Sequence, residues 1–109
     1  MNWRSKAILA LSALAVTPAF AADDGVILSI KDHRFDPAEL VLPADKKVAI
    51  TVKNLDPTPE EFESIELHRE KVVPGNKEIT VYIGPLQPGR YPFYGEFNQE
   101  TAQGAILVK

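Results

Sequence analysis

The chain has 109 residues, with 12 Lys or Arg, 15 Asp or Glu and no cysteine. This length suits one small domain, and the lack of cysteine excludes disulfides and thiolate metal sites. The excess of acidic residues argues against nucleic acid or an anionic membrane as the main partner.

The first 21 residues have the pattern of a secretory signal peptide. Arg4 and Lys6 form a positive start, residues 7–16 are apolar, and Ala19-Phe20-Ala21 is a small-x-small cleavage motif. The apolar run is far shorter than the ~20 residues that a membrane-spanning helix needs. We therefore expect export through the general secretory route to a bacterial periplasm.

Cleavage at this motif leaves one domain, residues 22–109, as the mature chain. It loses Arg4 and Lys6, so 10 basic residues face 15 acidic ones and the net charge becomes −5. We expect no membrane span in this mature chain, and no nucleic acid among its partners. Without a disulfide, its stability must come from packing.

The first half of the domain alternates short apolar runs with turns. Val26 to Ile30 is a β-branched run that predicts a strand, and residues 39–43 predict a second extended segment. Between them, Asp36-Pro37 favours a turn that sends Phe35 into the core. Lys47 to Asn54 has the clearest period-two pattern, which predicts a strand with one buried face.

Residues 60–67 lie between a proline-rich loop and the next extended run. In a strand, Glu60, Phe62 and Ser64 would share one side, and Glu61 and Glu63 the other. A helix of two or three turns is an alternative, because Glu and Leu favour helix. The outward glutamates have a second interpretation as the solvated face of an edge strand.

Extended runs continue over residues 68–73 and 78–83, and Glu70-Lys71 is expected to form a local ion pair. Leu86-x-Pro-Gly-x-Tyr91 then has the pattern of a tyrosine corner, in which the phenol hydrogen-bonds to the chain a few residues upstream. The stretch Tyr91 to Gly104 begins as an aromatic strand and becomes a polar loop, which leads into a last apolar strand.

These elements predict an all-β fold: a Greek-key β-sandwich of about seven strands. The order of its parts resembles the cupredoxins over nearly the whole mature chain. Three acidic segments resemble more narrowly the EfeO-type cupredoxin-like domains that accompany bacterial periplasmic iron-uptake permeases. The segments are Pro59-Glu60-Glu61-Phe62-Glu63-Ser64, Glu70-Lys71-Val72-Val73-Pro74 and residues 95–104.

The resemblance to cupredoxins also indicates what this chain lacks. Blue-copper cupredoxins use two histidines, a cysteine and a methionine, and the matching positions here are Glu60, Gly95, Asn98 and Ala102. A thiolate-imidazole copper site needs sulfur and nitrogen donors. We therefore expect no blue-copper electron transfer, although copper bound in another way stays possible.

The resemblance implies that two acidic segments, residues 60–63 and 96–100, meet at one end of the sandwich. Oxygen donors suit hard cations such as Fe³⁺, Mn²⁺ or Ca²⁺, and a histidine nitrogen would extend the set to Fe²⁺ or Cu²⁺. We assign no catalytic or other cofactor-binding residue. The candidate metal ligands are Glu60, Glu61, Glu63, His68, Glu96 and Glu100.

The resemblance favours a periplasmic metal-binding accessory of iron uptake, with a membrane iron permease system and a periplasmic metal-binding protein as partners. One alternative is oxidation of ferrous iron together with a copper-containing partner, which would need an electron acceptor. Another is a metal-free adaptor for a permease complex. Oxygen consumption on adding Fe²⁺ separates the first alternative from a carrier.

Overall fold

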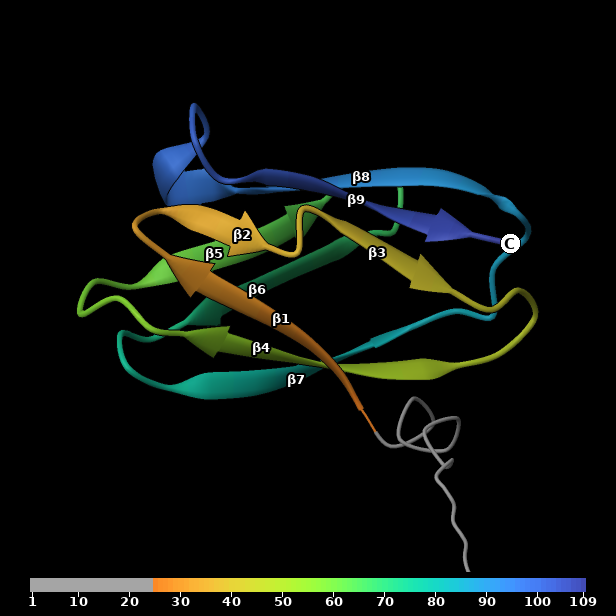
Figure 1. Cartoon of the computed structure of the whole chain (residues 1–109), viewed down its shortest axis with the longest axis horizontal. Helices are drawn as coiled ribbons and strands as arrows, with labels where there is room; N and C mark the ends of the chain where they lie inside the picture. Colours follow the sequence, from red (N-terminus) through yellow and green to blue (C-terminus); the bar gives the residue numbers. More distant parts are fainter. Residues whose placement is uncertain (1–24) are drawn as a thin grey trace, which may run out of the picture.

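The computed structural model describes residues 25–109, which form two β-sheets packed face to face (Figure 1). The predicted signal peptide lies outside the described residues. One sheet has the order β2-β1-β4-β7 and the other β3-β9-β8-β5-β6. The first sheet contains β1 (Val26–Lys31), β2 (Arg34–Asp36), β4 (Val48–Asn54) and β7 (Glu78–Ile83). The second contains β3 (Glu39–Leu42), β5 (Glu60–Ser64), β6 (Arg69–Val73), β8 (Gly89–Gly95) and β9 (Gln103–Val108).

The core between the sheets follows the alternation predicted for β4. Ile50 and Val52 are fully buried, and Val48 is partly buried against them. Three phenylalanine rings join the two sheets, since Phe35 comes from β2, Phe62 from β5 and Phe93 from β8. The ring centroids of Phe35 and Phe93 are 4.9 Å apart in an edge-to-face contact, and those of Phe62 and Phe93 are 5.1 Å apart. The predicted all-β sandwich is confirmed.

The structure decides three local features that the sequence analysis left open or assigned differently. Arg34–Asp36 pairs with β1 as a short strand rather than forming part of a turn, so the described residues contain nine strands instead of about seven. Residues 60–64 are a strand, not a helix. This strand lies between β8 and β6, so the interpretation of Glu61 and Glu63 as edge-strand residues is wrong.

The tyrosine corner is confirmed at the start of β8. The Tyr91 hydroxyl donates a hydrogen bond of 2.7 Å to the carbonyl oxygen of Gln87, four residues upstream. This bond fixes the point where the chain enters β8, which ends at Gly95 and continues into a 3₁₀ turn, η2 (Glu96–Asn98). The chain then returns along β9, so β8 and β9 position the polar loop between them at the end of the second sheet (Figure 1).

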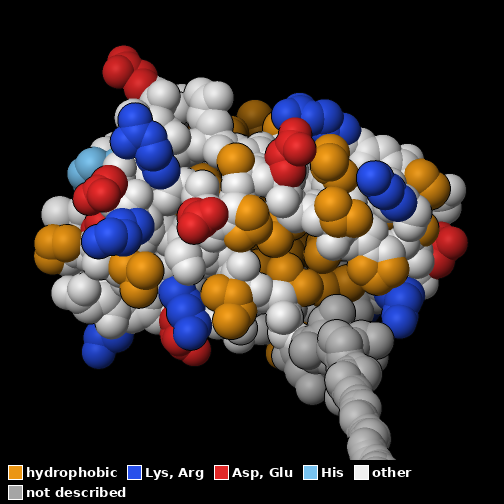
Figure 2. All heavy atoms as spheres, in the orientation of Figure 1, with side chains coloured by type: hydrophobic (Ala, Val, Ile, Leu, Met, Phe, Trp, Pro, Cys, Tyr) orange, Lys and Arg blue, Asp and Glu red, His pale blue; other side chains and the backbone are white. Residues whose placement is uncertain are grey.

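The face of the molecule shown in Figure 2 has hydrophobic side chains gathered near its middle and charged ones around them. A hollow of about 120 Å³ lies there, lined by Val26, Val41, Leu42 and Val48 together with Pro43, Lys46 and Lys47. Its lining contains no acidic side chain. Within residues 25–109, no helix has the length and apolar character needed to cross a membrane.

Candidate metal centre

Strand β5 sends its glutamates to opposite faces of the five-stranded sheet. Glu60 is 1% exposed and shares the inner face with Phe62 and Ser64, as the period-two pattern predicted. Glu61 and Glu63 lie on the outer face. One strand therefore contributes to two different carboxylate environments.

The inner carboxylate, Glu60, links β5 to the loop after β8. Its Oε1 accepts hydrogen bonds from the backbone N–H groups of Glu61 (2.9 Å) and Phe97 (2.8 Å). Its Oε2 accepts a 2.6 Å hydrogen bond from the side-chain amide of Asn98. The charge of Glu60 is thus satisfied by three donors, two of which belong to η2.

Gly95 and Ala102 pack tightly around this carboxylate. The backbone N–H of Gly95 donates to the carbonyl oxygen of Ala102 at 2.8 Å, which closes the loop. A Cβ atom on Gly95 would lie 2.7 Å from both the Cδ of Glu60 and the Cβ of Ala102, closer than carbon atoms approach. Only glycine fits here, because the Glu60 side chain fills the space.

The four positions that match copper ligands in cupredoxins therefore do come together, but they do not suit copper. Glu60, Gly95, Asn98 and Ala102 offer one carboxylate and one amide, with no sulfur and no imidazole. The carboxylate already accepts three hydrogen bonds, and its atoms occupy the interior. A blue-copper centre does not fit these residues.

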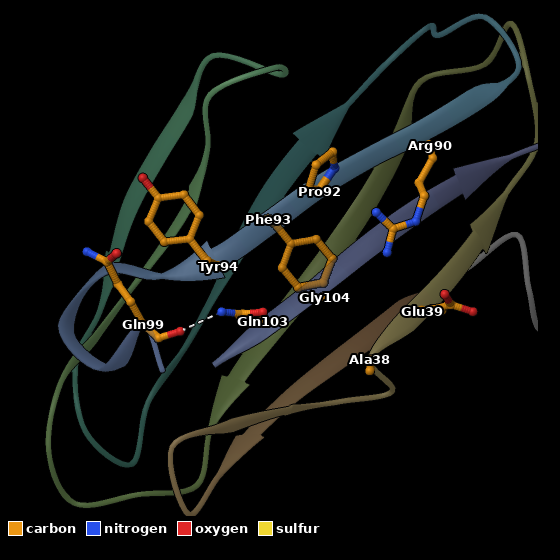
Figure 3. A pocket seen from close by; sticks show the side chains of 9 residues that line it. All are labelled: Ala38, Glu39, Arg90, Pro92, Phe93, Tyr94, Gln99, Gln103 and Gly104. Atoms are coloured by element: carbon orange, nitrogen blue, oxygen red, sulfur yellow. Dashed lines mark hydrogen bonds between the residues drawn. The ribbon is translucent and has the colours of Figure 1, made fainter. Parts of the chain in front are cut away.

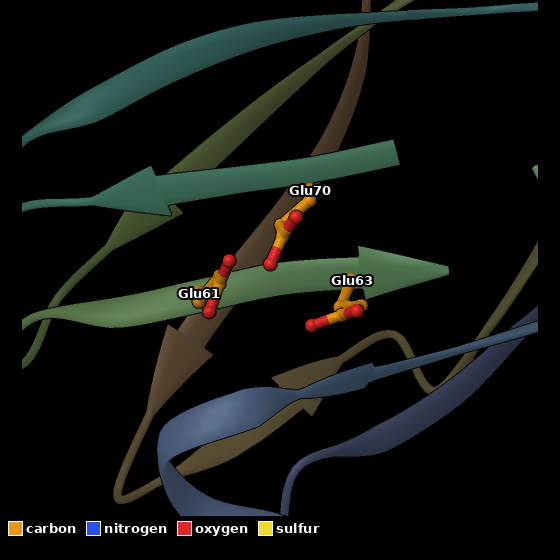
Figure 4. A group of neighbouring side chains, drawn as sticks. All are labelled: Glu61, Glu63 and Glu70. Carbon is orange, nitrogen blue, oxygen red and sulfur yellow. The ribbon is translucent and has the colours of Figure 1, made fainter. Parts of the chain in front are cut away.

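The outer face carries the described carboxylates that cluster closely enough to hold an ion. Glu61, Glu63 and Glu70 each offer an oxygen, and these oxygens lie within 4.8 Å of one another. Glu63 and Glu70 are direct partners on β5 and β6. Figure 4 shows the three side chains converging over the two strands. We call Glu61, Glu63 and Glu70 the carboxylate cluster.

Crowding of like charge changes the acidity of this cluster. Burial, a hydrogen bond with Glu70 and the charges of Glu70, Glu63 and Glu96 raise the pKa of Glu61 to about 7. Burial and the charges of Glu70 and Glu96 also raise the pKa of Glu63. Both pKa values are raised by burial and because the anionic forms repel one another, and a cation bound between the carboxylates would relieve this repulsion.

The raised pKa of Glu61 predicts a pH-dependent loss of stability. The folded value of about 7 lies above the ordinary 4.5, so the folded protein binds the extra proton between these pH values. The contribution of this proton to the free energy of unfolding is complete below about pH 4.5 and is lost as the pH rises through about 7. As the pH rises through this interval, we expect the urea midpoint of Glu61→Gln to increase relative to that of the wild type.

Glu78→Gln is the matched control for this measurement, because Glu78 is exposed on β7 in the other sheet. Its midpoint should follow the wild-type curve at each pH. A Glu61→Gln curve parallel to the wild type would contradict the assignment of the shifted proton to Glu61.

Glu96 adjoins the carboxylate cluster, whereas two other predicted ligands lie elsewhere. Glu96 begins η2 and forms a side-chain hydrogen bond with Glu63. Glu100 is exposed in the loop after η2, beside a hollow shared with His33 and Phe97. His68 ends the turn between β5 and β6, at the end of β5 opposite Glu60, near Ile83 and Leu86. Neither Glu100 nor His68 belongs to the cluster.

A ligand candidate that the sequence analysis missed is Glu70, which was interpreted as the ion-pair partner of Lys71. Within residues 25–109 no such ion pair forms, and Glu70 lies opposite Glu63 instead. The signal was available in principle. Antiparallel pairing of residues 60–64 with 69–73 through a short turn places Glu63 and Glu70 across from each other.

Tyr94 on β8 is the aromatic neighbour of the cluster. It pairs directly with Glu63, and burial together with the charges of Glu63, Glu96, Glu61 and Glu70 raises its pKa. The ring of Tyr94 also forms one wall of a groove of about 440 Å³ that contains Arg90, Gln103 and Gly104 (Figure 3). Tyr94 therefore separates this groove from the carboxylate cluster.

Comparison with known proteins agrees with this architecture. The family described as cupredoxin-like domain matches residues 5–108. An uncharacterized protein of Rickettsia prowazekii (strain Madrid E) is 46% identical over 83 residues, which cover 76% of this chain and 66% of that protein. This chain thus spans slightly less than two thirds of the length of that relative.

Among solved structures, the metal-binding domain of the Cu(I)-exporting P-type ATPase CopA of Streptococcus pneumoniae D39, solved with Cu(I), has a TM-score of 0.70 at 17% identity. The match covers 78% of this chain and 84% of that one. Auracyanin A, a blue copper protein of Chloroflexus aurantiacus, has a TM-score of 0.66 at 14% identity, covering 78% and 98%. Such identities show the fold alone. The family match over residues 5–108 shows that the chain belongs to the cupredoxin-like domain family.

Proposed function

We propose that this protein is a periplasmic metal carrier of the EfeO type, which accompanies bacterial iron uptake. In this proposal, residues 1–21 direct export and residues 22–109 form the carrier domain. The domain binds iron or another hard cation and exchanges it with a membrane iron permease system and a periplasmic metal-binding partner. The resemblance of the acidic segments to EfeO-type domains supports the iron context.

The observation that carries the proposal is the convergence of Glu61, Glu63 and Glu70 with no neutralising basic side chain among the described residues. Their oxygens lie within 4.8 Å of one another, and no Lys, Arg or His of residues 25–109 forms an ion pair with them. Such an arrangement costs free energy unless protons or a cation relieve the repulsion. Carboxylate oxygens are the donors that hard cations prefer.

The predicted ligand set changes accordingly. Glu61, Glu63 and Glu70 bind the ion, and Glu96 closes the site from η2, beside Glu63. Glu60 faces inward and accepts hydrogen bonds from Phe97 and Asn98 in η2, so it is not a ligand of the metal ion in this proposal. Copper(II) bound by these oxygens is the relevant competitor, because the sulfur donors that Cu(I) favours are missing from the cluster.

Thermal unfolding of the purified protein with ferric nitrilotriacetate, Mn²⁺ or Cu²⁺ tests the proposal. An ion that binds the folded state stabilises it by about 2.7 kcal/mol at 100 times its Kd. For a domain of this size, that corresponds to a rise in Tm of about 10 °C or more. We expect such a rise in the wild type, and its loss in the double variant Glu61→Gln/Glu63→Gln.

Glu78→Gln is again the control, and it should keep the full rise in Tm. A wild-type Tm that no metal changes would overturn the carrier proposal and leave the metal-free adaptor. The transport role has its own test: replacing the gene by the Glu61→Gln/Glu63→Gln form should slow uptake of radioactive iron by the native bacterium. Unchanged uptake would contradict that role.

A further inference from the structure

The hydroxyl group of Tyr94 is directed toward the carboxylate cluster. Tyr94 on β8 is the cross-strand partner of Glu63 on β5. In Figure 3 its ring lines the groove, while its hydroxyl points away from Gln103 and toward the neighbouring strands. No hydrogen bond joins this hydroxyl to another group of residues 25–109, whereas the hydroxyl of Tyr91 donates to a carbonyl. The phenol oxygen of Tyr94, the cross-strand partner of Glu63, therefore has no hydrogen-bonding partner among the described residues.

A second, independent observation comes from Glu61. Its side chain belongs to a residue that is only 9% exposed, and Figure 4 shows it directed into the cluster. Among residues 25–109, its carboxylate contacts no basic side chain, and its ligand oxygen lies within 4.8 Å of those of Glu63 and Glu70. Buried charged groups are normally paired or bound to a metal. The cluster thus joins one buried carboxylate, Glu61, to the half-buried Glu63 and the exposed Glu70.

We propose that the phenol oxygen of Tyr94 joins Glu61, Glu63 and Glu70 as a ligand, and that the cargo is trivalent iron. This inference rests on the carrier function proposed above and names its substrate. On binding, the phenol O–H bond breaks, the phenolate oxygen donates to Fe³⁺, and the phenol proton passes to water together with any proton held by the carboxylates. No electron is transferred, so no oxidant is required.

The charge of the ligand set favours a trivalent over a divalent ion. With the phenolate, the proposed ligand set carries four negative charges, which Fe³⁺ neutralises more fully than Mn²⁺ or Ca²⁺ does. A phenol that binds a cation loses its proton most readily to a strongly polarising one such as Fe³⁺. Phenolate is an established type of ligand for iron in proteins. Divalent ions should therefore bind the carboxylates and leave Tyr94 protonated.

Visible absorption distinguishes the phenolate ligand from carboxylates alone, because a ferric phenolate has a charge-transfer band that carboxylate complexes lack. Ferric nitrilotriacetate added to the purified wild type should give this band together with the rise in Tm. Tyr94→Phe should lose the band and keep a smaller rise in Tm. Its affinity for iron should fall about tenfold. Mn²⁺ should give no band with either protein.

Tyr82→Phe is the matched control, since Tyr82 is exposed on β7 in the other sheet, and it should keep the band. A rise in Tm without a band in the wild type would overturn the role of Tyr94 and leave the carrier function standing. A band that persists in Tyr94→Phe would also overturn it. No rise in Tm with any ion would instead remove the carrier function itself.

Discussion

Replacing Glu60 by leucine should destabilise the protein by about 3 kcal/mol, because it leaves three donors without an acceptor. The N–H groups of Glu61 and Phe97 and the amide of Asn98 all donate to the Glu60 carboxylate. Leucine has a similar volume but accepts no hydrogen bond. The free energy of unfolding in urea measures the loss, and amide exchange at Phe97 should accelerate more than exchange in β4.

Glu60→Gln is the conservative control for this change. The glutamine oxygen can still accept from the two N–H groups, and rotation of the Asn98 amide presents its oxygen to the new NH₂ group. We expect a loss of about 1 kcal/mol. If Glu60→Leu were as stable as the wild type, the cost of burying a carboxylate would equal the benefit of its hydrogen bonds, and the role of Glu60 as a tether would be wrong.

Gly95→Ala should cost about 2 kcal/mol, because the new methyl group has no room. Its Cβ atom would lie 2.7 Å from the Cδ of Glu60 and 2.7 Å from the Cβ of Ala102. The side chain of Glu60 would have to move and weaken its hydrogen bonds to η2. Urea unfolding of the purified protein measures the effect.

A double-mutant cycle with Ala102→Gly separates this overlap from other effects of the alanine. Removing the methyl group of Ala102 relieves one of the two contacts, so the double variant should be more stable than the sum of the single losses predicts. Gly25→Ala is the control, since a Cβ atom there meets nothing within 4 Å. Strict additivity of Gly95→Ala and Ala102→Gly would contradict direct overlap.

Local patterns in the sequence were sufficient to predict the sandwich and the two sides of β5. Alternation in residues 48–52 follows from burial of one face, and the same rule put Glu60 and Glu61 on opposite sides of the strand. The tyrosine corner was predictable because its bond spans four residues, from Tyr91 to Gln87. The separate short strand at Arg34–Asp36 was not, since three residues between turns have too little pattern.

The composition of the candidate site depended on register between strands, which a single sequence defines poorly. Glu70 faces Glu63 through the pairing of β5 with β6, while the sequence analysis assigned it to its neighbour Lys71. His68 was included for its nitrogen donor, but the turn places it at the far end of β5. Tyr94 was not among the predicted ligands, because its nearness to Glu63 arises from pairing across 31 positions of the chain.

The three hydrogen bonds of Glu60 have a consequence for how a carrier of this design would behave during exchange of its cargo. The Glu60 carboxylate holds the loop between β8 and β9 in place through hydrogen bonds, so the shape of this loop does not depend on a bound ion. Under the proposed carrier function, the metal-free and metal-bound protein would then present nearly the same surface to a permease. Delivery would be decided by proton competition at the outer strands, without the carrier unfolding after each transfer.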